Sequence, residues 1–182
     1  MITAIIIGSL VALVVFFVIF TYNIFVRLTN AVDNAWANID VLLKQRFDEL
    51  PNLVSTVKAY TKHEKELFER IAQLRSEYVN CPTLEGKGDV ATQASSTIRS
   101  LFAVAERYPE LKANENFLAL QKRISELEDM IADRREYYNE TVRIYNTRIL
   151  QIPYVFVARL GSFAQREHFS FKDRTEAVTV EI

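Results

Sequence analysis

The residues able to carry acid–base or metal chemistry are few in this sequence, and they form no catalytic pattern. The two histidines are His63 and His168. A zinc-protease helix needs a second histidine four residues after the first, and His63-Glu64 is not followed by one. A two-iron helical bundle needs a glutamate three residues before each histidine, whereas Tyr60 and Gln165 stand at those positions. We therefore expect no metal site and no cofactor.

Nucleophilic and carboxylate chemistry also lacks a recognisable arrangement. Cys81 is the only cysteine, so it has no intrachain disulfide partner. The chain contains no glycine-rich phosphate loop and no G-x-S-x-G nucleophile elbow. The acidic residues of 126–133 alternate with Lys and Arg, as on a solvated helix face, and an acid–base pair there is the remote alternative. We predict a protein that is not an enzyme.

A repeated Tyr-Asn pair is the most distinctive polar feature of the chain. Tyr138-Asn139 and Tyr145-Asn146 are seven residues apart, so both pairs lie on one face of a helix. Asn is a poor helix former. One interpretation is structural, with the tyrosines in the core and each amide capping a helix or meeting a neighbouring backbone. The other is a contact strip for another copy or another protein, in which a polar residue fixes the register.

The chain begins with an apolar segment. Residues 2–20 carry no charge, and the first charged side chain is Arg27. Roughly 20 apolar helical residues cross the hydrocarbon core of a bilayer. A cleaved signal peptide would have a basic start, a shorter apolar core and a small-residue cleavage site, and the segment has none of these. We predict a single transmembrane helix within residues 1–27, with Tyr22 at the interface.

The composition of the remaining residues predicts one all-α domain. The whole chain has 22 basic and 23 acidic residues, and they are interleaved, whereas a nucleic-acid-binding protein would show a basic surplus or stripe. We therefore expect no nucleic-acid partner. Good helix formers dominate, and the four glycines and four prolines mark most of the breaks.

Apolar residues at steps of three and four predict three long helices, over about 29–78, 89–108 and 114–152. Because so long a helix cannot bury a face alone, we expect a long antiparallel helical bundle in residues 28–152. The last helix begins with a coiled-coil heptad. Arg134 then occupies an expected apolar position, after which the stripe shifts by one residue.

Three local signals refine these helices. Pro51 predicts either a kink or a new helix start in the first helix. Thr61 and Glu64 form a capping-box pattern, although the strong helix formers around them favour a continuous helix. Residues 79–88 read as a loop, and Asp89 is the expected N-cap of the next helix.

The C-terminal residues 153–182 are predicted to form a cap and a tail. Pro153 ends the last long helix, and the apolar stretch 154–158 is too short to span a bilayer. It either caps the end of the bundle or lies on the membrane surface or on a partner. Residues 175–182 read as a loose end or an edge strand.

Several ordered blocks give the chain a family resemblance. They are Asn34 to Arg46, Pro51 to Glu64, Tyr108 to Phe117 and the two Tyr-Asn pairs. Over nearly the whole chain the sequence resembles the LemA family of bacterial membrane proteins. The candidate interaction or signature residues are Asn34, Trp36, Asp40, Arg46, Pro51, Asn52, His63, Glu64, Tyr108, Pro109, Lys112, Asn114, Asn116, Tyr138, Asn139, Tyr145 and Asn146.

The end of the chain departs from the family pattern. Ile152-Pro153 stands where the family usually has Phe-Pro, and Leu160-Gly161-Ser162-Phe163 stands where it has a Phe-Gly-Phe turn. The resemblance implies a membrane-anchored helical bundle of the long, bent, four-helix kind, with no established enzymatic activity. Some relatives look like lipoproteins, which implies an exported domain, and others are associated with building internal bacterial membranes, which favours a scaffold.

The side of the membrane is argued from two opposing signals. The segment after the apolar run carries Arg27, Lys44 and Arg46, and this weak excess favours a cytoplasmic domain. The lipoprotein-like relatives imply the outer side. We expect a single-pass protein of the bacterial cell membrane with its bundle outside the cytoplasm, and keep the cytoplasmic side as the alternative.

The predicted function is that of a membrane-anchored scaffold or interaction protein. The expected partners are the lipid bilayer, a second copy of the chain and other membrane or envelope proteins. The alternative is a ligand-sensing or signalling subunit with a polar pocket between its helices. That pocket would be supplied by Trp36, Arg46, His63, Tyr138 and Asn139.

Overall fold

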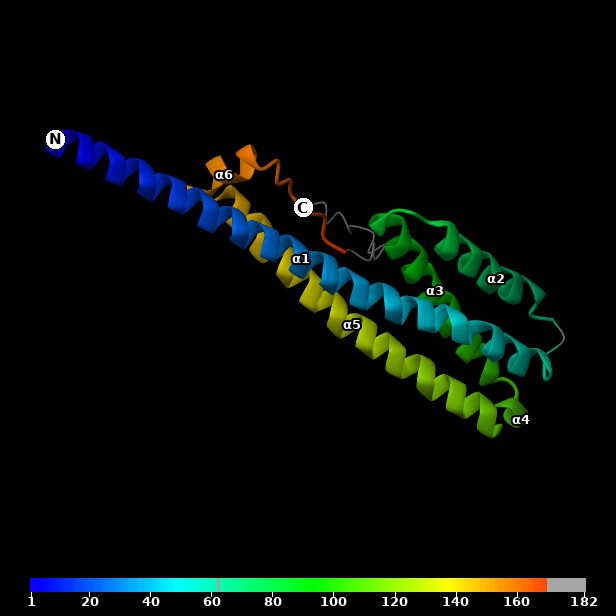
Figure 1. Cartoon of the computed structure of the whole chain (residues 1–182). Coiled ribbons are helices and arrows are strands. Elements are labelled where there is room, and N and C mark those ends of the chain that lie inside the picture. Colours follow the sequence, from blue (N-terminus) through cyan, green and yellow to red (C-terminus); the bar gives the residue numbers. More distant parts are fainter. Residues whose placement is uncertain (62, 170–182) are drawn as a thin grey trace, which may run out of the picture. The chain divides into compact units, whose positions relative to one another are not determined.

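The computed structural model describes residues 1–61 and 63–169, and it is all-α over these residues. The long helices are α1 (Ile2–Lys58), α2 (Lys65–Asn80), α3 (Leu84–Ala105) and α5 (Glu115–Leu150), and the short ones are α4 (Pro109–Lys112) and α6 (Tyr154–Leu160), all labelled in Figure 1. The predicted fold class, an apolar N-terminal helix followed by a helical bundle, is confirmed.

The described residues divide into two compact units. Unit 1 contains Met1–Asn38 and Arg134–His168, and unit 2 contains the described residues of 39–133 together with Phe169. Helices α1 and α5 each contribute residues to both units. The sequence-based division into an anchor, a bundle and a C-terminal cap stays a prediction.

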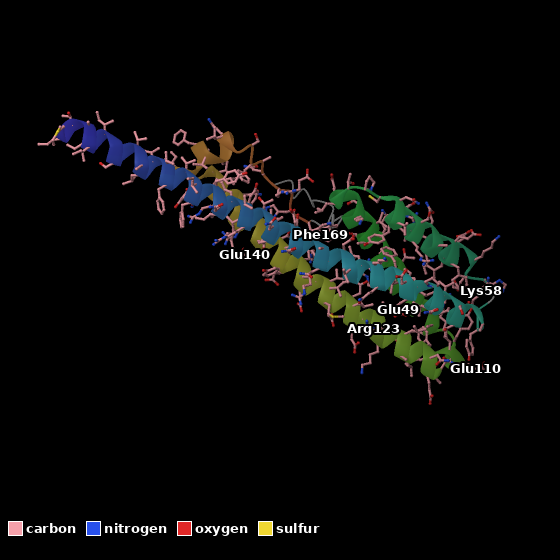
Figure 2. All side chains as sticks on the ribbon, viewed as in Figure 1. Glu49, Lys58, Glu110, Arg123, Glu140 and Phe169 are labelled. Carbon is pink, nitrogen blue, oxygen red and sulfur yellow. The ribbon has the colours of Figure 1, made fainter. Side chains whose placement is uncertain are left out.

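Helix α1 is apolar and exposed at its start. It is long and apolar enough to cross a membrane, and most of its large apolar side chains up to Phe20 are exposed, with Phe17 and Val18 half-buried (Figure 2). A core helix of a soluble domain would be buried instead. Burial in α1 begins with Thr21 and Phe25.

Helix α1 continues through Pro51, so the alternative of a new helix start there is wrong. Proline removes one backbone hydrogen bond from a helix interior. Pro51 itself is exposed, while Leu50 and Leu53 beside it are fully buried. Packing of these neighbours therefore holds the helix through the proline.

The predicted continuous helix over 29–78 is wrong, because α1 ends at Lys58 and α2 begins at Lys65. The backbone N–H groups of Tyr60 and Thr61 both donate to the Val57 carbonyl, at 3.0 and 3.2 Å. This turn lets α2 fold back, so that Tyr78 reaches Asp40. In one straight helix these two residues would lie about 57 Å apart. Tertiary packing therefore overrides local helix propensity here.

The two predicted helix starts after α1 are also corrected. The Thr61–Glu64 capping box does not form: the Thr61 hydroxyl donates to the Val57 carbonyl (3.2 Å), and Glu64 precedes α2 without a side-chain cap. Helix α3 begins at Leu84, before the predicted cap Asp89. Its N-cap is Thr83, whose hydroxyl accepts a hydrogen bond from the Gly86 N–H at 3.2 Å. That cap satisfies an end N–H and offsets the low helix propensity of the glycines that follow.

Unit 2 buries one apolar face of each long helix that contributes to it. The faces follow steps of three and four residues, as packed helices require. The buried side chains include Ile39, Leu43, Phe47, Leu50 and Leu53 of α1, Ile71 and Leu74 of α2, Ala94, Ile98 and Leu101 of α3, and Phe117, Ile124 and Leu127 of α5.

Unit 1 combines the first part of α1 with the last part of α5, α6 and the extended segment after it (Figure 1). Its buried side chains are Phe25, Val32 and Ala35 of α1, Tyr138, Val142, Tyr145 and Ile149 of α5, and Val157 and Ala158 of α6. The opposite side of α5 is charged and exposed, as at Glu140 in Figure 2. The predicted tail residues 175–182 lie outside the described residues.

Candidate functional site

Arg46 is the centre of a buried polar cluster in unit 2. Its side chain has no solvent exposure, and its guanidinium donates to Glu128 (2.6 Å), to the Ser95 hydroxyl (2.9 Å) and to the Ala91 carbonyl (3.1 Å). Three helices, α1, α3 and α5, are joined by this one side chain. Burial lowers the pKa of Arg46, and the Glu128 carboxylate opposes that shift. The guanidinium therefore depends on Glu128 for compensation of its charge.

A second polar group in unit 2 ties α1 to α2 and α3 through Asp40. The Tyr78 hydroxyl donates to one Asp40 carboxylate oxygen at 2.8 Å, and the Lys87 ammonium donates to the same oxygen at 2.6 Å. Burial first, and then the hydrogen bond to Asp40, raise the pKa of Tyr78. Phe47 stacks on Tyr78 with ring centroids 4.5 Å apart.

These two groups suit positioning of helices better than proton transfer. A general acid or base works best when its pKa lies near the operating pH, and the shift at Tyr78 moves its pKa further from neutrality. Each charge also has a partner on another helix, since Arg46 pairs with Glu128 and Lys87 with Asp40. Such pairs fix which helix faces which.

In unit 1 three residues of the two Tyr-Asn pairs, Tyr138, Tyr145 and Asn146, bind the chain's own extended segment after α6. The Tyr145 hydroxyl donates to the Ala164 carbonyl (2.8 Å), and the Tyr138 hydroxyl donates to the Glu167 carbonyl (2.9 Å). Asn146 pairs with the Arg166 backbone in both directions, accepting from its N–H (2.9 Å) and donating to its carbonyl (2.8 Å). The Asn146 side-chain amide thus makes the two hydrogen bonds that a neighbouring β-strand would otherwise make with this extended backbone.

The same segment is held at two further points within unit 1. Arg166 forms an ion pair with Asp33 of α1 at 3.2 Å. Phe163 packs on Phe25 with ring centroids 5.1 Å apart. Burial raises the pKa of Tyr138, with Arg166 opposing the shift, so its hydroxyl stays protonated as a donor.

Comparison with known proteins decides the family. The model of the LemA family matches residues 35–182. The chain belongs to the LemA family. Its polar cluster around Arg46 and its two Tyr-Asn pairs both lie inside the matched region.

Relatives of this LemA chain include proteins of two kinds. Magnetosome protein MamQ 2 of Paramagnetospirillum magneticum is 26% identical over 177 residues, covering 83% of this chain and 65% of the relative. Magnetosome protein MamQ of Magnetospirillum gryphiswaldense is 23% identical over 196 residues, covering 90% and 71%. Protein LemA of Metamycoplasma hominis is 28% identical over 128 residues, covering 70% and 58%.

The chain therefore spans less than two thirds of the length of two of these relatives. Neither the family description nor the names of the relatives state an enzymatic activity. Family membership and the apolar start of α1 make this a LemA-type membrane protein. Its predicted lack of enzymatic activity stays a prediction.

The other LemA-signature residues hold helix ends or lie at the surface. Asn114 accepts a hydrogen bond from the Phe117 N–H (2.9 Å) and so caps α5. Glu64 pairs with Arg107 at 2.8 Å, and Lys112 pairs with Glu106. Pro109 opens α4 after Tyr108, where proline fits because the first N–H groups of a helix lack partners. The exposed members are Asn34, Pro51, Asn52, His63 and Asn116.

The five residues predicted to line a ligand pocket fall into both units. Trp36, Tyr138 and Asn139 belong to unit 1, where Trp36 meets the Tyr138 ring edge-on with centroids 6.2 Å apart. Arg46 and His63 belong to unit 2, and Arg46 is occupied by Glu128. Trp36 is only half-buried, although its size and its place in the apolar helical pattern favour the core.

Sequence reasoning missed the partners of these residues. Glu128 was assigned to a solvated face, yet it is the acceptor for the buried Arg46. Ser95, Tyr78 and Lys87 carried no signal of their own. The partners of the Tyr-Asn pairs are backbone groups of residues 164–167, which no side-chain pattern can reveal.

Proposed function

We propose that this chain is a membrane-anchored helical scaffold that acts by self-association or by docking a partner protein. The observation that carries the proposal is the continuity of α1. This one helix holds both the exposed apolar segment up to Phe20 and the buried residues Phe25, Val32 and Ala35 of unit 1. No flexible linker separates the segment that enters the membrane from the residues that pack. Such a connection suits a protein that presents a surface at a membrane.

A candidate surface for self-association lies on α5. Tyr137 and Ile144 are exposed apolar residues of this helix, both in unit 1, and are seven residues apart. Apolar residues repeating every seven positions favour pairing with a helix of a second copy. The relatives named as magnetosome proteins are described by a cellular structure and not by a reaction, which supports an architectural role.

Self-association is tested by counting copies of the full chain in lipid discs and in membranes by single-molecule photobleaching. We expect assemblies of two or more copies, which the double variant Tyr137→Glu/Ile144→Glu converts to monomers. The control Thr147→Glu adds a charge at another exposed position of α5 and should leave the assembly intact. A monomeric parent protein would remove the self-association half of the proposal.

Partner docking is tested separately with photo-crosslinking amino acids at exposed positions such as Val41 and Tyr137 in native membranes. A scaffold should give discrete adducts that depend on the position of the probe. A protein that is monomeric in lipid discs and gives no position-dependent adduct would contradict the whole proposal.

The alternative, a ligand-sensing subunit, finds support in one hollow of unit 2. The hollow of about 440 Å³ lies at the break between α1 and α2, where Lys58, Thr61, Lys65 and Phe68 are among its lining residues. It combines an apolar floor with basic and acidic groups, as small-molecule sites do. Native mass spectrometry of the membrane-extracted chain would favour this function by detecting a co-purified small molecule that Phe68→Glu removes.

The side of the membrane is part of the same proposal. We place the domain outside the cytoplasm on the strength of the resemblance to lipoprotein-like relatives. Cys81, the only cysteine, is half-buried at the end of α2. A membrane-impermeant maleimide should label it in intact cells, with Cys81→Ser as the blank. Labelling that requires opened cells would place the domain in the cytoplasm.

A further inference from the structure

Helix α6 is apolar on its outer side as well as on its inner side. Val157 and Ala158 are buried, whereas Ile152, Phe156 and Leu160 are 79%, 65% and 78% exposed. Phe156 and Leu160 are four positions apart in α6 and so lie on one face of it, and Ile152 is exposed just before the helix; we call these three residues the stripe. A water-facing stripe would be polar in a soluble domain, and a helix that is apolar all round belongs in an apolar environment. Something apolar is therefore expected to cover this stripe.

The position of α6 on α1 indicates what that cover is. The Tyr154 ring stacks on Phe17 with centroids 6.0 Å apart, and Phe163 meets Tyr22 edge-on at 5.5 Å. Both contacts are within unit 1, and Figure 1 shows α6 beside α1 at a distance from its N-terminal end. Phe17 lies within the uncharged segment, and Tyr22 lies just after it. Helix α6 is thus level with the last turns of the apolar segment.

Gly161 makes this placement possible. A Cβ atom added to Gly161 would lie 2.5 Å from the Phe163 ring and 3.3 Å from the Tyr22 ring. The absent side chain lets the chain reverse after α6 and return Phe163 to α1. The chain departs from the family's Phe-Gly-Phe turn but keeps the glycine of that turn. The turn therefore places the Phe163 ring at the boundary of the apolar segment.

The charged side chains in the sequence around α6 are all positive. Residues 141–166 contain no Asp or Glu but include Arg143, Arg148, Arg159 and Arg166, and residues 1–32 contain only Arg27. Arg143 is bound to Glu140, and Arg166 to Asp33. Arg148 lies over the Tyr154 ring at 4.3 Å. Arg148 and Arg143 also line a hollow of about 300 Å³ between α1 and α5.

We infer that residues 150–163 form a second membrane contact, with α6 lying in the interface of the bilayer and with its Arg159, together with Arg27 of α1, binding anionic phospholipid headgroups. The inference rests on α1 spanning the membrane, as in the proposed function. Burial of the stripe removes three large apolar side chains from water, and long arginine side chains reach the headgroups from an apolar helix. A second copy of the chain could cover the same stripe, but residues 141–166 of that copy also lack Asp and Glu, so its stripe would bring no anionic partner to Arg27 and Arg159.

The experiment is a depth measurement on the full chain in lipid discs containing phosphatidylcholine and phosphatidylglycerol. In a Cys81→Ser background, a nitroxide label is placed by Phe156→Cys or Leu160→Cys. Leu13→Cys serves as the reference within the apolar segment, and Lys122→Cys as the reference in water. Two collision rates are compared for each label. One is the rate with oxygen, which enters lipid, and the other is the rate with a water-soluble nickel complex.

We expect the Phe156 and Leu160 labels to resemble the Leu13 label, with oxygen collisions dominant. Labels at 156 and 160 that resemble the Lys122 label, beside a lipid-like Leu13, would overturn the inference and leave the anchor intact. Labels shielded from both reagents and broadened by a neighbouring nitroxide would overturn it in favour of a second copy. A Leu13 label exposed to the nickel complex would overturn both the inference and the proposed anchoring.

Preference for anionic lipid is tested by the same labels in discs of phosphatidylcholine alone. Each arginine near an anionic surface strengthens binding about fivefold. Anionic lipid should therefore increase the oxygen-to-nickel ratio of the Phe156 label, and Arg27→Gln/Arg159→Gln should reduce that increase. Equal ratios in both lipids would overturn the assignment of anionic headgroups. The variant Arg123→Gln, on the exposed surface of α5, is the matched control.

Discussion

The two units use polar side chains in opposite ways. In unit 2 the buried polar groups are charged and pair side chain to side chain across helices, as Arg46 does with Glu128. In unit 1 they are neutral and bind backbone, as Asn146 does with Arg166. Charge pairs select one packing of helices because a wrong neighbour leaves a buried charge. Neutral side chains that bind backbone groups can hold an extended segment whatever the side chains of that segment are.

This difference predicts that single substitutions affect the two units very unequally. Loss of a charged partner leaves Arg46 buried without compensation, whereas loss of an amide leaves backbone groups that water can reach. Four substitutions can break or sharpen the comparison.

The largest effect is expected from Glu128→Ala in unit 2. Because Arg46 has no solvent exposure, its charge would lose its compensation, and we expect the free energy of unfolding to fall by about 3–5 kcal/mol. Chemical denaturation of the detergent-solubilised chain measures this. The double variant Arg46→Met/Glu128→Leu should recover most of the loss. A Glu128→Ala variant as stable as the parent would show that the pair does not hold the unit.

A smaller and local effect is expected from Asn146→Ala in unit 1. The substitution removes two hydrogen bonds to Arg166, each worth about 1 kcal/mol. The Arg166 amide should then exchange with deuterium about 10- to 100-fold faster, with little change in global stability. Asn146→Asp keeps an acceptor for that N–H and should give an intermediate rate. An unchanged exchange rate would show that the tyrosine hydroxyls, Phe163 and Asp33 hold the segment without the Asn146 amide.

The helices of this chain could be predicted where one periodic pattern decides the structure. In α5 the buried residues Phe117, Ile124 and Leu127 follow the heptad, and Arg134 marks the shift of the stripe with an exposed side chain. The helix ends at Lys58 and Leu84 could not be predicted, because long-range packing of Tyr78 and the local Thr83 cap decide them. For the candidate site residues, the residue type indicated a polar or packing role, but the sequence did not indicate which groups each residue contacts.

Trp36 shows why partners escape a sequence-based prediction. Its size and its place in the helical pattern favour full burial, yet it is half-buried beside the Tyr138 ring. We therefore expect Trp36→Ala to lower the free energy of unfolding by about 1–2 kcal/mol, less than a fully buried aromatic residue would. Thermal unfolding compares it with Phe117→Ala, at a fully buried position of unit 2. A loss as large as that of Phe117→Ala would restore Trp36 as a core anchor.

The smallest effect near neutral pH is expected from Tyr78→Phe, and its value lies in its pH dependence. The pKa of Tyr78 is raised in the folded chain by burial and by Asp40. Above about pH 10 an unfolded tyrosine loses its proton while the folded one keeps it, so unfolding is favoured and stability falls as pH rises. Tyr78→Phe loses the hydrogen bond to Asp40, about 1 kcal/mol near neutral pH, but should reduce the alkaline fall. The midpoint of unfolding by denaturant between pH 8 and 11 measures both. A variant that falls as steeply as the parent would mean that Tyr138 or the lysines, and not the Asp40 cluster of unit 2, set its alkaline limit.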